Sequence, residues 1–290
     1  KKSVVLDFSD EDDLAVAHAL SAHADVLVEN FKPGGLARFG LDYDSVHARN
    51  DTVVYCSISG FGSARGASLP GYDLIVQAMS GLMSLTGDPD GPAYRAGISV
   101  FDVMAGLHST IGILAALRHR SETGQGQHVE TSLLASAMSG LVNQTSAYVA
   151  GGVTPTRMGN AHPSLFPYEP LPTADLDLVV TAGNDAQFRK LVQVLGVPEL
   201  ADDERFARNS DRTKRRDELR PLLVERLETR SAAHWFTELN AVGVPNGPIN
   251  SIARGVEYAV ELGLEPIVQV GTDGATVPGV RNPISFSTIT

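Results

Sequence analysis

Short runs of strand-forming residues alternate with helical segments through the first half of the chain. The strand-like runs cover residues 4–8, 25–31, 52–59 and 128–131. Segments with the apolar spacing of helices lie between or after them, at 14–20, 72–82, 103–119 and 133–149. Strands separated by helices are typical of βαβ units, so the order predicts an α/β fold with a parallel sheet. Because segment 103–119 is apolar around most of its circumference, we expect that helix to lie deep inside.

The composition changes at Gly151. Residues 151–173 are rich in glycine, proline and threonine, which indicates a linker or a loop over a site. The segments that follow predict a smaller α+β unit. They are a strand at 176–181, helices after Asp185 and at 213–227 and 232–242, a turn at 243–248, a helix at 252–262 and strands near Ile267 and Ile284.

Charge and cysteine content limit the classes of partner. The 290-residue chain carries a formal net charge of −11, which argues against nucleic acid or an anionic membrane as the main partner. Cys56 is the one cysteine, which excludes an internal disulfide and fits a reducing compartment. The sequence has no signal peptide and no apolar stretch of membrane-spanning length. It therefore predicts a cytoplasmic protein without nucleic-acid or membrane partners.

Neither the histidines nor the glycine motifs point to a metal or a dinucleotide. The eight histidines are scattered, with no HExxH pair and no Cys/His cluster, which predicts no metal site. His162 stands out because it lies in the loop-like segment 159–163. Residues 57–62 follow a strand but lack the spacing of dinucleotide, P-loop and nucleophile-elbow motifs. A strand-to-loop turn is the favoured interpretation, and a nicotinamide-dependent dehydrogenase is disfavoured.

Asp102 immediately precedes the helix predicted at 103–119. An aspartate at that position is a normal helix N-cap. The position also suits a reactive carboxylate, because nearby N–H groups and the positive helix end would keep the group ionised and aimed. The residue pattern alone leaves both interpretations open.

Several segments, taken in order, resemble CoA-transferase family III, the CaiB/BaiF type. The resemblance covers nearly the whole chain. The segments are DVLVENFKPG at 25–34, SISGFG at 57–62, PGYDLIVQAMSG at 70–81, IGILAAL at 111–117 with TGQGQ at 123–127, GNAHP at 159–163 and GVPNGP at 243–248.

The resemblance implies a fold. We expect a Rossmann-like large domain at 1–155, a smaller α+β domain at 156–258, a return toward the large domain at 259–290, and a homodimer of interlinked chains. The first βα unit of the family has no counterpart here, and the chain stops at Thr290 without a closing helix. We therefore expect an N-terminal βα unit and the C-terminal end to be missing from this sequence.

The resemblance also implies a reaction, in which coenzyme A moves from an acyl-CoA to an acceptor carboxylic acid. CoA is then a substrate and a product, and no cofactor is bound permanently. An aspartate attacks the thioester to form a mixed anhydride, and the released thiolate converts it to an aspartyl-CoA thioester. Asp102 matches the family nucleophile. Asn30, Phe31 and Arg38 match CoA-binding positions, since an arginine can hold phosphate and an aromatic ring can cover adenine.

Further residues match positions near the family nucleophile. Tyr72 and Asp73 match residues beside it and complete the predicted CoA-binding set. The loop with Gly159, Asn160 and His162 matches a segment that closes over the intermediates. That loop is poorer in glycine than in the formate/oxalate enzymes, which argues against a formyl or oxalyl substrate.

Two alternatives remain open. An acyl-CoA racemase of the same superfamily needs a second acid/base group. Racemases place a histidine where this chain has Tyr72, and a phenol with a pKa near 10 is a poor proton shuttle, so transferase is favoured. A non-catalytic CoA-binding protein would use Asp102 only as a helix cap. Small dicarboxylates and carnitine-like acids are the acceptors that the resemblance suggests.

Overall fold

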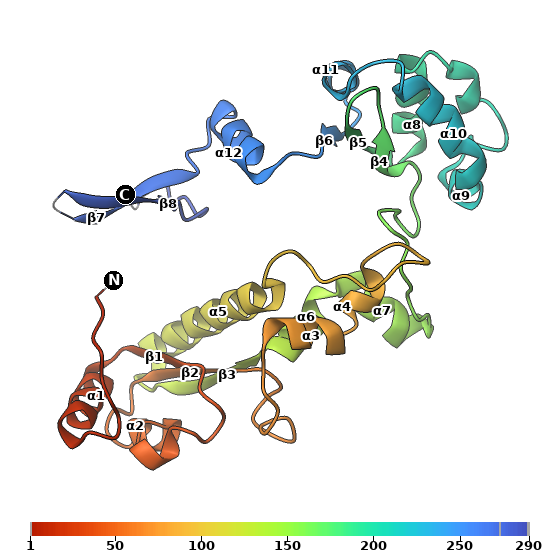
Figure 1. Cartoon of the computed structure of the whole chain (residues 1–290). Helices are drawn as coiled ribbons and strands as arrows, with labels where there is room; N and C mark the ends of the chain where they lie inside the picture. The colour runs from red at the N-terminus through yellow and green to blue at the C-terminus, as the bar shows by residue number, and fades with distance from the viewer. Residues whose placement is uncertain (1, 273, 289–290) are drawn as a thin grey trace. The chain divides into compact units, whose positions relative to one another are not determined.

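The chain folds into two compact units, one running to Gly159 and one from Asn160 onward. The computed structural model in Figure 1 describes residues 2–272 and 274–288. Each unit has its own sheet and its own apolar core.

The first unit is built on a parallel sheet with strand order β1–β2–β3. The parallel pairing confirms the predicted α/β class. Its strands are β1 (Val26–Glu29), β2 (Val54–Ser59) and β3 (Gln127–Ser132). Its helices are α1 (Glu11–His23), α2 (Tyr43–His47), α3 (Asp73–Met79), α4 (Leu82–Leu85), α5 (Val100–Thr123), α6 (Leu133–Gly140) and α7 (Val142–Gly151), with a 3-10 turn, η1 (Ala37–Phe39).

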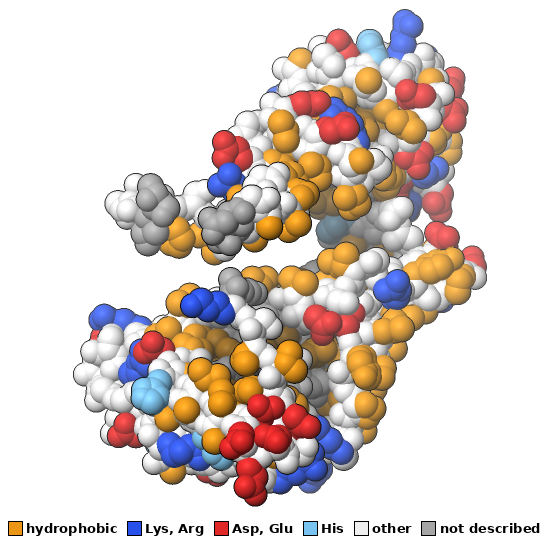
Figure 2. Space-filling view, turned by 60° about the vertical axis from the view of Figure 1, so that its left-hand side comes forward, with side chains coloured by type: hydrophobic (Ala, Val, Ile, Leu, Met, Phe, Trp, Pro, Cys, Tyr) orange, Lys and Arg blue, Asp and Glu red, His pale blue; other side chains and the backbone are white. Residues whose placement is uncertain are grey.

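Helix α5 lies along one face of this sheet and packs on β2 and β3 (Figure 1). Its buried side includes Phe101, Ala105 and Ala116. The expectation that the whole helix lies inside is wrong for its other side, where four apolar side chains are each more than half exposed. They are Val103, Leu107, Ile111 and Leu114. Hydrophobic side chains are visible at the molecular surface in Figure 2.

The length and composition of α5 also correct the expectation about membrane-spanning segments. The helix is long and apolar enough to cross a membrane by those two criteria alone. Core helices of soluble proteins can meet the same criteria, and α5 packs on a sheet within its own unit.

Two further segments of the first unit differ from the sequence-based expectations. Residues 4–8 form no strand, and Leu6 and Phe8 pack against a small core that includes Leu36. The single helix expected at 133–149 is divided into α6 and α7. The division coincides with Val142, whose φ of 35° is incompatible with a regular right-handed helix.

The second unit is an antiparallel sheet, β4–β5–β6, covered by helices. Its strands are β4 (Tyr168–Pro172), β5 (Asp177–Thr181) and β6 (Asn246–Pro248), followed by a hairpin of β7 (Ile267–Thr272) and β8 (Ala275–Val280). Its helices are α8 (Asp185–Val194), α9 (Asn209–Lys214), α10 (Arg216–Leu227), α11 (Ala232–Ala241) and α12 (Ile252–Glu261), with a 3-10 turn, η2 (Pro198–Ala201).

The strands of the second unit differ from the expected ones at three places. Strand β4 was not expected, because it contains Pro170 and Pro172 and proline is rare inside strands. The two prolines are tolerated because β4 is an edge strand of the sheet. The expected turn at 243–248 includes β6, which pairs with β5. Ile284 is not in a strand, and the strand that pairs with β7 is β8, which ends at Val280.

Arg212 is fully buried in the core of the second unit. Its guanidinium donates to the main-chain oxygens of Phe166 (3.0 Å) and Phe206 (2.8 Å) and to the Asp185 carboxylate (2.8 Å). It also lies over the ring of Phe188, 4.3 Å from the centroid. One side chain therefore joins α8, α9 and the segment before β4.

We predict that Arg212→Met destabilises the protein. The carbonyls of Phe166 and Phe206 would be left without donors, and an unpaired buried polar group costs roughly 1–3 kcal/mol. The free energy of unfolding in a urea titration should fall by at least about 2 kcal/mol. As a control, Arg189→Met removes an exposed pair with Asp202 and should change stability by less than about 1 kcal/mol. Equal losses in the two variants would contradict the assignment.

Candidate active site

A cavity of about 760 Å³ lies at the carboxyl ends of β1 and β2 in the first unit. Parallel α/β sheets bind their ligands at this end of the strands. The walls come from the turn after β1, the end of β2, the loop before α3, and the first turns of α5 and α6. The lining residues are 28–33, 58–60, 68–72, Asp102, Ala105, Gly106 and Leu133.

Asp102 lies in the first turn of α5, which begins at Val100, and the N-cap position is Ser99. Of the two interpretations that the residue pattern left open, the helix N-cap is therefore wrong. The residue at the N-cap, Ser99, makes no side-chain capping bond. The Asp73 carboxylate on α3 accepts hydrogen bonds from the N–H groups of Phe101 (2.7 Å) and Asp102 (3.2 Å). Asp73 therefore caps the helix, and Asp102 is among the residues that line the cavity.

The two carboxyl groups have contrasting environments. Asp73 is buried and accepts hydrogen bonds from two N–H groups and from the amide of Gln77. Asp102 belongs to the cavity wall, where partial burial raises its pKa, and the charge of nearby Asp73 raises that pKa further. A more basic carboxylate is a better nucleophile once it is ionised.

Gln77 ties α3 to the segment that leads into α5. The side chain is fully buried, and its Oε1 accepts from the Ala96 N–H at 2.8 Å. Its Nε2 donates to Asp73 and, at 3.2 Å, to the Ile98 carbonyl. Sequence reasoning did not identify Gln77. The available signal was its position four residues after Asp73, which places both on one helix face.

Three of the predicted CoA-binding residues share this cavity with Asp102. They are Asn30, Phe31 and Tyr72. Phe31 and Tyr72 are 53% and 71% exposed as residues, so both are accessible to a ligand. Lys32 supplies the one basic side chain among the described residues that line the cavity.

The other two predicted CoA-binding residues are placed differently. Arg38 is outside the lining, and its guanidinium lies over the neighbouring Phe39 ring, 4.4 Å from the centroid. Asp73 is also outside the lining, and its carboxylate is occupied in capping α5. The geometry of Asp73 therefore favours positioning of Asp102 over direct contact with CoA.

The predicted substrate loop spans the boundary between the units. In the first unit, the Gly159 N–H donates to the Gly87 carbonyl at 3.0 Å. In the second, Asn160 is exposed, and the His162 ring lies 4.9 Å from that of Tyr168. A role for Gly159, Asn160 and His162 over the intermediates stays a prediction.

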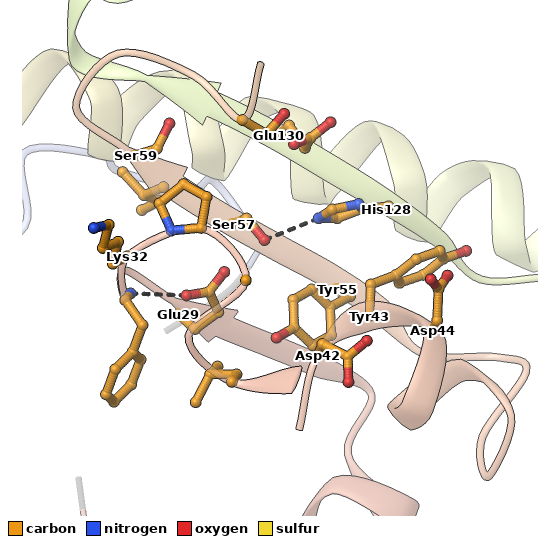
Figure 3. A pocket seen from close by; sticks show the side chains of 16 residues that line it. Glu29, Lys32, Asp42, Tyr43, Asp44, Tyr55, Ser57, Ser59, His128 and Glu130 are labelled. Carbon is orange, nitrogen blue, oxygen red and sulfur yellow. Dashed lines mark hydrogen bonds between the residues drawn. The ribbon is translucent and has the colours of Figure 1, made fainter. Parts of the chain in front are cut away.

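A smaller cavity, of about 250 Å³, shares several lining residues with the first (Figure 3). Ser57 on β2 and His128 on β3 form a hydrogen bond there, with Oγ and Nε2 2.9 Å apart. Glu29 and Glu130 flank Ser57 in the strand register, and the Tyr43 ring stacks on His128 at 4.7 Å. Sequence reasoning did not identify this pair, because it requires knowing which strands are neighbours.

The arrangement around Asp102 supports nucleophilic chemistry on an acyl group. It offers a basic carboxylate on a capped helix, in a cavity with aromatic and amide side chains that can contact a large ligand. Among residues 2–272 and 274–288, no group of three or more His, Cys, Asp or Glu side chains is arranged to hold a metal ion.

Comparison with known proteins agrees with this chemistry. Succinate–glutarate CoA-transferase of Agrobacterium fabrum is 42% identical over 298 residues, which span 99% of this chain and 72% of that protein. Acetyl-CoA:oxalate CoA-transferase of Acetobacter aceti is 38% identical over 289 residues, which span 99% and 73%. The crystal structure of a CaiB/BaiF family protein from Brucella suis matches with a TM-score of 0.87 and 42% identity, covering 99% of this chain and 75% of that one.

The match to a family extends along the whole chain. The sequence model that defines CoA-transferase family III matches residues 1–290. This match agrees with the parallel sheet of the first unit and with the motifs found in the sequence. The chain belongs to CoA-transferase family III, the CaiB/BaiF family.

Proposed function

We propose that this enzyme transfers coenzyme A from an acyl-CoA to a carboxylic acid through a covalent intermediate on Asp102. CoA transfer itself follows from the family and its relatives. The observation that carries the role of Asp102 is its position in the cavity wall, on a helix whose N-terminus is capped by a different carboxylate. A residue needed only as a helix cap would occupy the place that Asp73 takes.

In the first half of the proposed reaction, an oxygen of the Asp102 carboxylate attacks the thioester carbonyl carbon. The C–S bond breaks, and CoA leaves as the thiolate while a mixed anhydride forms. The thiolate then attacks the Asp102 carbonyl carbon of the anhydride. The donor acid leaves as its carboxylate, and an aspartyl-CoA thioester remains.

In the second half, the acceptor carboxylate attacks the aspartyl thioester and displaces the thiolate, which forms a second mixed anhydride. The thiolate attacks the acceptor carbonyl carbon, the acceptor leaves as its CoA ester, and the Asp102 carboxylate is regenerated. No net proton is taken up or released. Each step exchanges one activated carbonyl for another, which is why a covalent route suits the exchange.

We further propose dicarboxylates as acceptors. The relative from Agrobacterium fabrum is named for succinate and glutarate, and the one from Acetobacter aceti for acetyl-CoA and oxalate. A dicarboxylate keeps one free carboxylate during transfer, which needs a positive partner. Lys32 is the basic side chain in the same cavity wall as Asp102, and a charge-assisted hydrogen bond from its ammonium would hold that group.

Trapping with hydroxylamine tests the covalent role. We expect wild-type protein incubated with succinyl-CoA, glutaryl-CoA or acetyl-CoA to give a hydroxamate on the peptide that contains Asp102, detected by mass spectrometry. Asp102→Asn removes the nucleophile, so it should give no hydroxamate and should lower kcat at least about a thousandfold.

The control for this experiment is Asp90→Asn, which changes an exposed carboxylate outside the cavity lining and should react like wild type.

The rates with glutarate, succinate, oxalate and the monocarboxylate butyrate rank the acceptors. A wild-type protein that binds acyl-CoA and exchanges its α-hydrogen with solvent, without any adduct, would support the racemase alternative. Binding with neither reaction would support a non-catalytic CoA-binding protein.

The environment of Asp102 also predicts a pH dependence. Only the ionised carboxylate attacks, and its pKa is raised by burial and by the charge of Asp73. On acidification, kcat/KM should therefore begin to fall at a pH above the usual pKa range of an aspartate. Asp73→Asn removes the negative charge beside Asp102 but keeps an oxygen that can accept hydrogen bonds from the N–H groups of α5. Its acidic limb should therefore move to lower pH, measured relative to its own plateau. A limb at unchanged or higher pH would contradict the Asp73–Asp102 interaction.

A further inference from the structure

Gly60 and Gly71 touch through their backbones in the wall of the cavity. A Cβ atom on Gly60 would lie 2.3 Å from the Gly71 Cα, and a Cβ on Gly71 would lie 2.3 Å from the Gly60 Cα. Neither glycine has a φ in the left-handed region. Glycine is therefore required at both positions by the close approach of two chain segments and not by a special backbone conformation.

This contact joins the sheet to the segment that caps α5. Gly60 directly follows β2, and its carbonyl accepts from the Leu134 N–H at 3.1 Å, which links it to the start of α6. Gly71 lies two residues before Asp73, whose carboxylate accepts from the N–H groups at the start of α5. Both glycines line the same cavity as Asp102.

We propose that Gly60 and Gly71 are positioning residues for the transfer reaction. Their contact holds the segment before α3 against the sheet, which places the Asp73 carboxylate on the first turn of α5. That turn carries Asp102. The proposal deepens the function proposed above and rests on the role of Asp102 in it.

The size of the expected displacement follows from the contact distances. Relieving a Cβ contact of 2.3 Å to ordinary van der Waals distance needs a shift of about 1 Å or more. The bonds from Phe101 and Asp102 to Asp73 are 2.7 and 3.2 Å long, and hydrogen bonds weaken steeply beyond their normal range. A misplacement of about 1 Å can lower a rate by about a hundredfold.

The test compares Gly60→Ala, Gly71→Ala and the double variant. Each single variant should slow hydroxamate formation on Asp102 and lower kcat by about a hundredfold. Because either Cβ alone separates the segments, the double variant should lose little more than one single variant, and the two effects should be strongly non-additive. The acidic limb of kcat/KM should also move to lower pH, as Asp73 is drawn away from Asp102.

The matched control is Gly97→Ala, in the loop before α5. A Cβ at Gly97 would meet nothing within 4 Å, so this variant should keep the wild-type rate and pH profile. Folding is followed by circular dichroism and thermal unfolding. If Gly60→Ala fails to fold, Gly71→Ala, in the loop before α3, carries the test.

The outcomes separate this proposal from the one it rests on. If the wild-type protein forms no hydroxamate on Asp102, the proposed function itself is wrong. Wild-type protein with an adduct, alongside alanine variants within about twofold of its rate, would overturn the positioning role. So would additive losses with an unchanged pH profile, or failure of both single variants to fold while Gly97→Ala folds, since these indicate a purely structural contact.

Discussion

The hydrogen bonds between the Asp73 carboxylate and the first N–H groups of α5 hold the candidate site together. The first N–H groups of any helix lack intrahelical partners, and a negative charge there is also favoured by the helix dipole. Here the charge comes from a different helix, so the cap joins α3 to α5 as well as ending a helix. Gln77 extends the connection to Ala96 and Ile98. The orientation of Asp102 thus depends on contacts made by neighbouring segments.

Two nearby carboxyl groups, Asp73 as the helix cap and Asp102 in the cavity wall, differ in their surroundings. Asp73 is buried, and its carboxylate accepts hydrogen bonds from the N–H groups of Phe101 and Asp102. Partial burial raises the pKa of Asp102 in the cavity wall, and the charge of Asp73 raises that pKa further. The carboxylate that caps the helix is therefore a different group from the one in the cavity wall.

The sequence supported the α/β class and the place of Asp102 near a helix start, since strand and helix periodicities are local properties. It could not reveal that Asp73 caps α5, because Asp73 precedes its two partners by 28 positions (Phe101) and 29 positions (Asp102) along the chain. The Ser57–His128 pair and the Gly60–Gly71 contact depend in the same way on segments distant in the chain. Strand β4 could not be predicted because it contains Pro170 and Pro172. A strand tolerates these prolines at the edge of a sheet, and the order of the strands in the sheet is not visible in the sequence.

The shortage of positive charge around the cavity has a kinetic consequence. An acyl-CoA carries several negative charges, and it approaches a protein with a net charge of −11 whose cavity wall has Lys32 as its basic residue among those described. Long-range forces therefore oppose the encounter, and recognition must rely on contacts made after the ligand has arrived. Added salt screens long-range repulsion more than it weakens close contacts. Capture of the thioester should therefore quicken as ionic strength rises, the reverse of electrostatic steering.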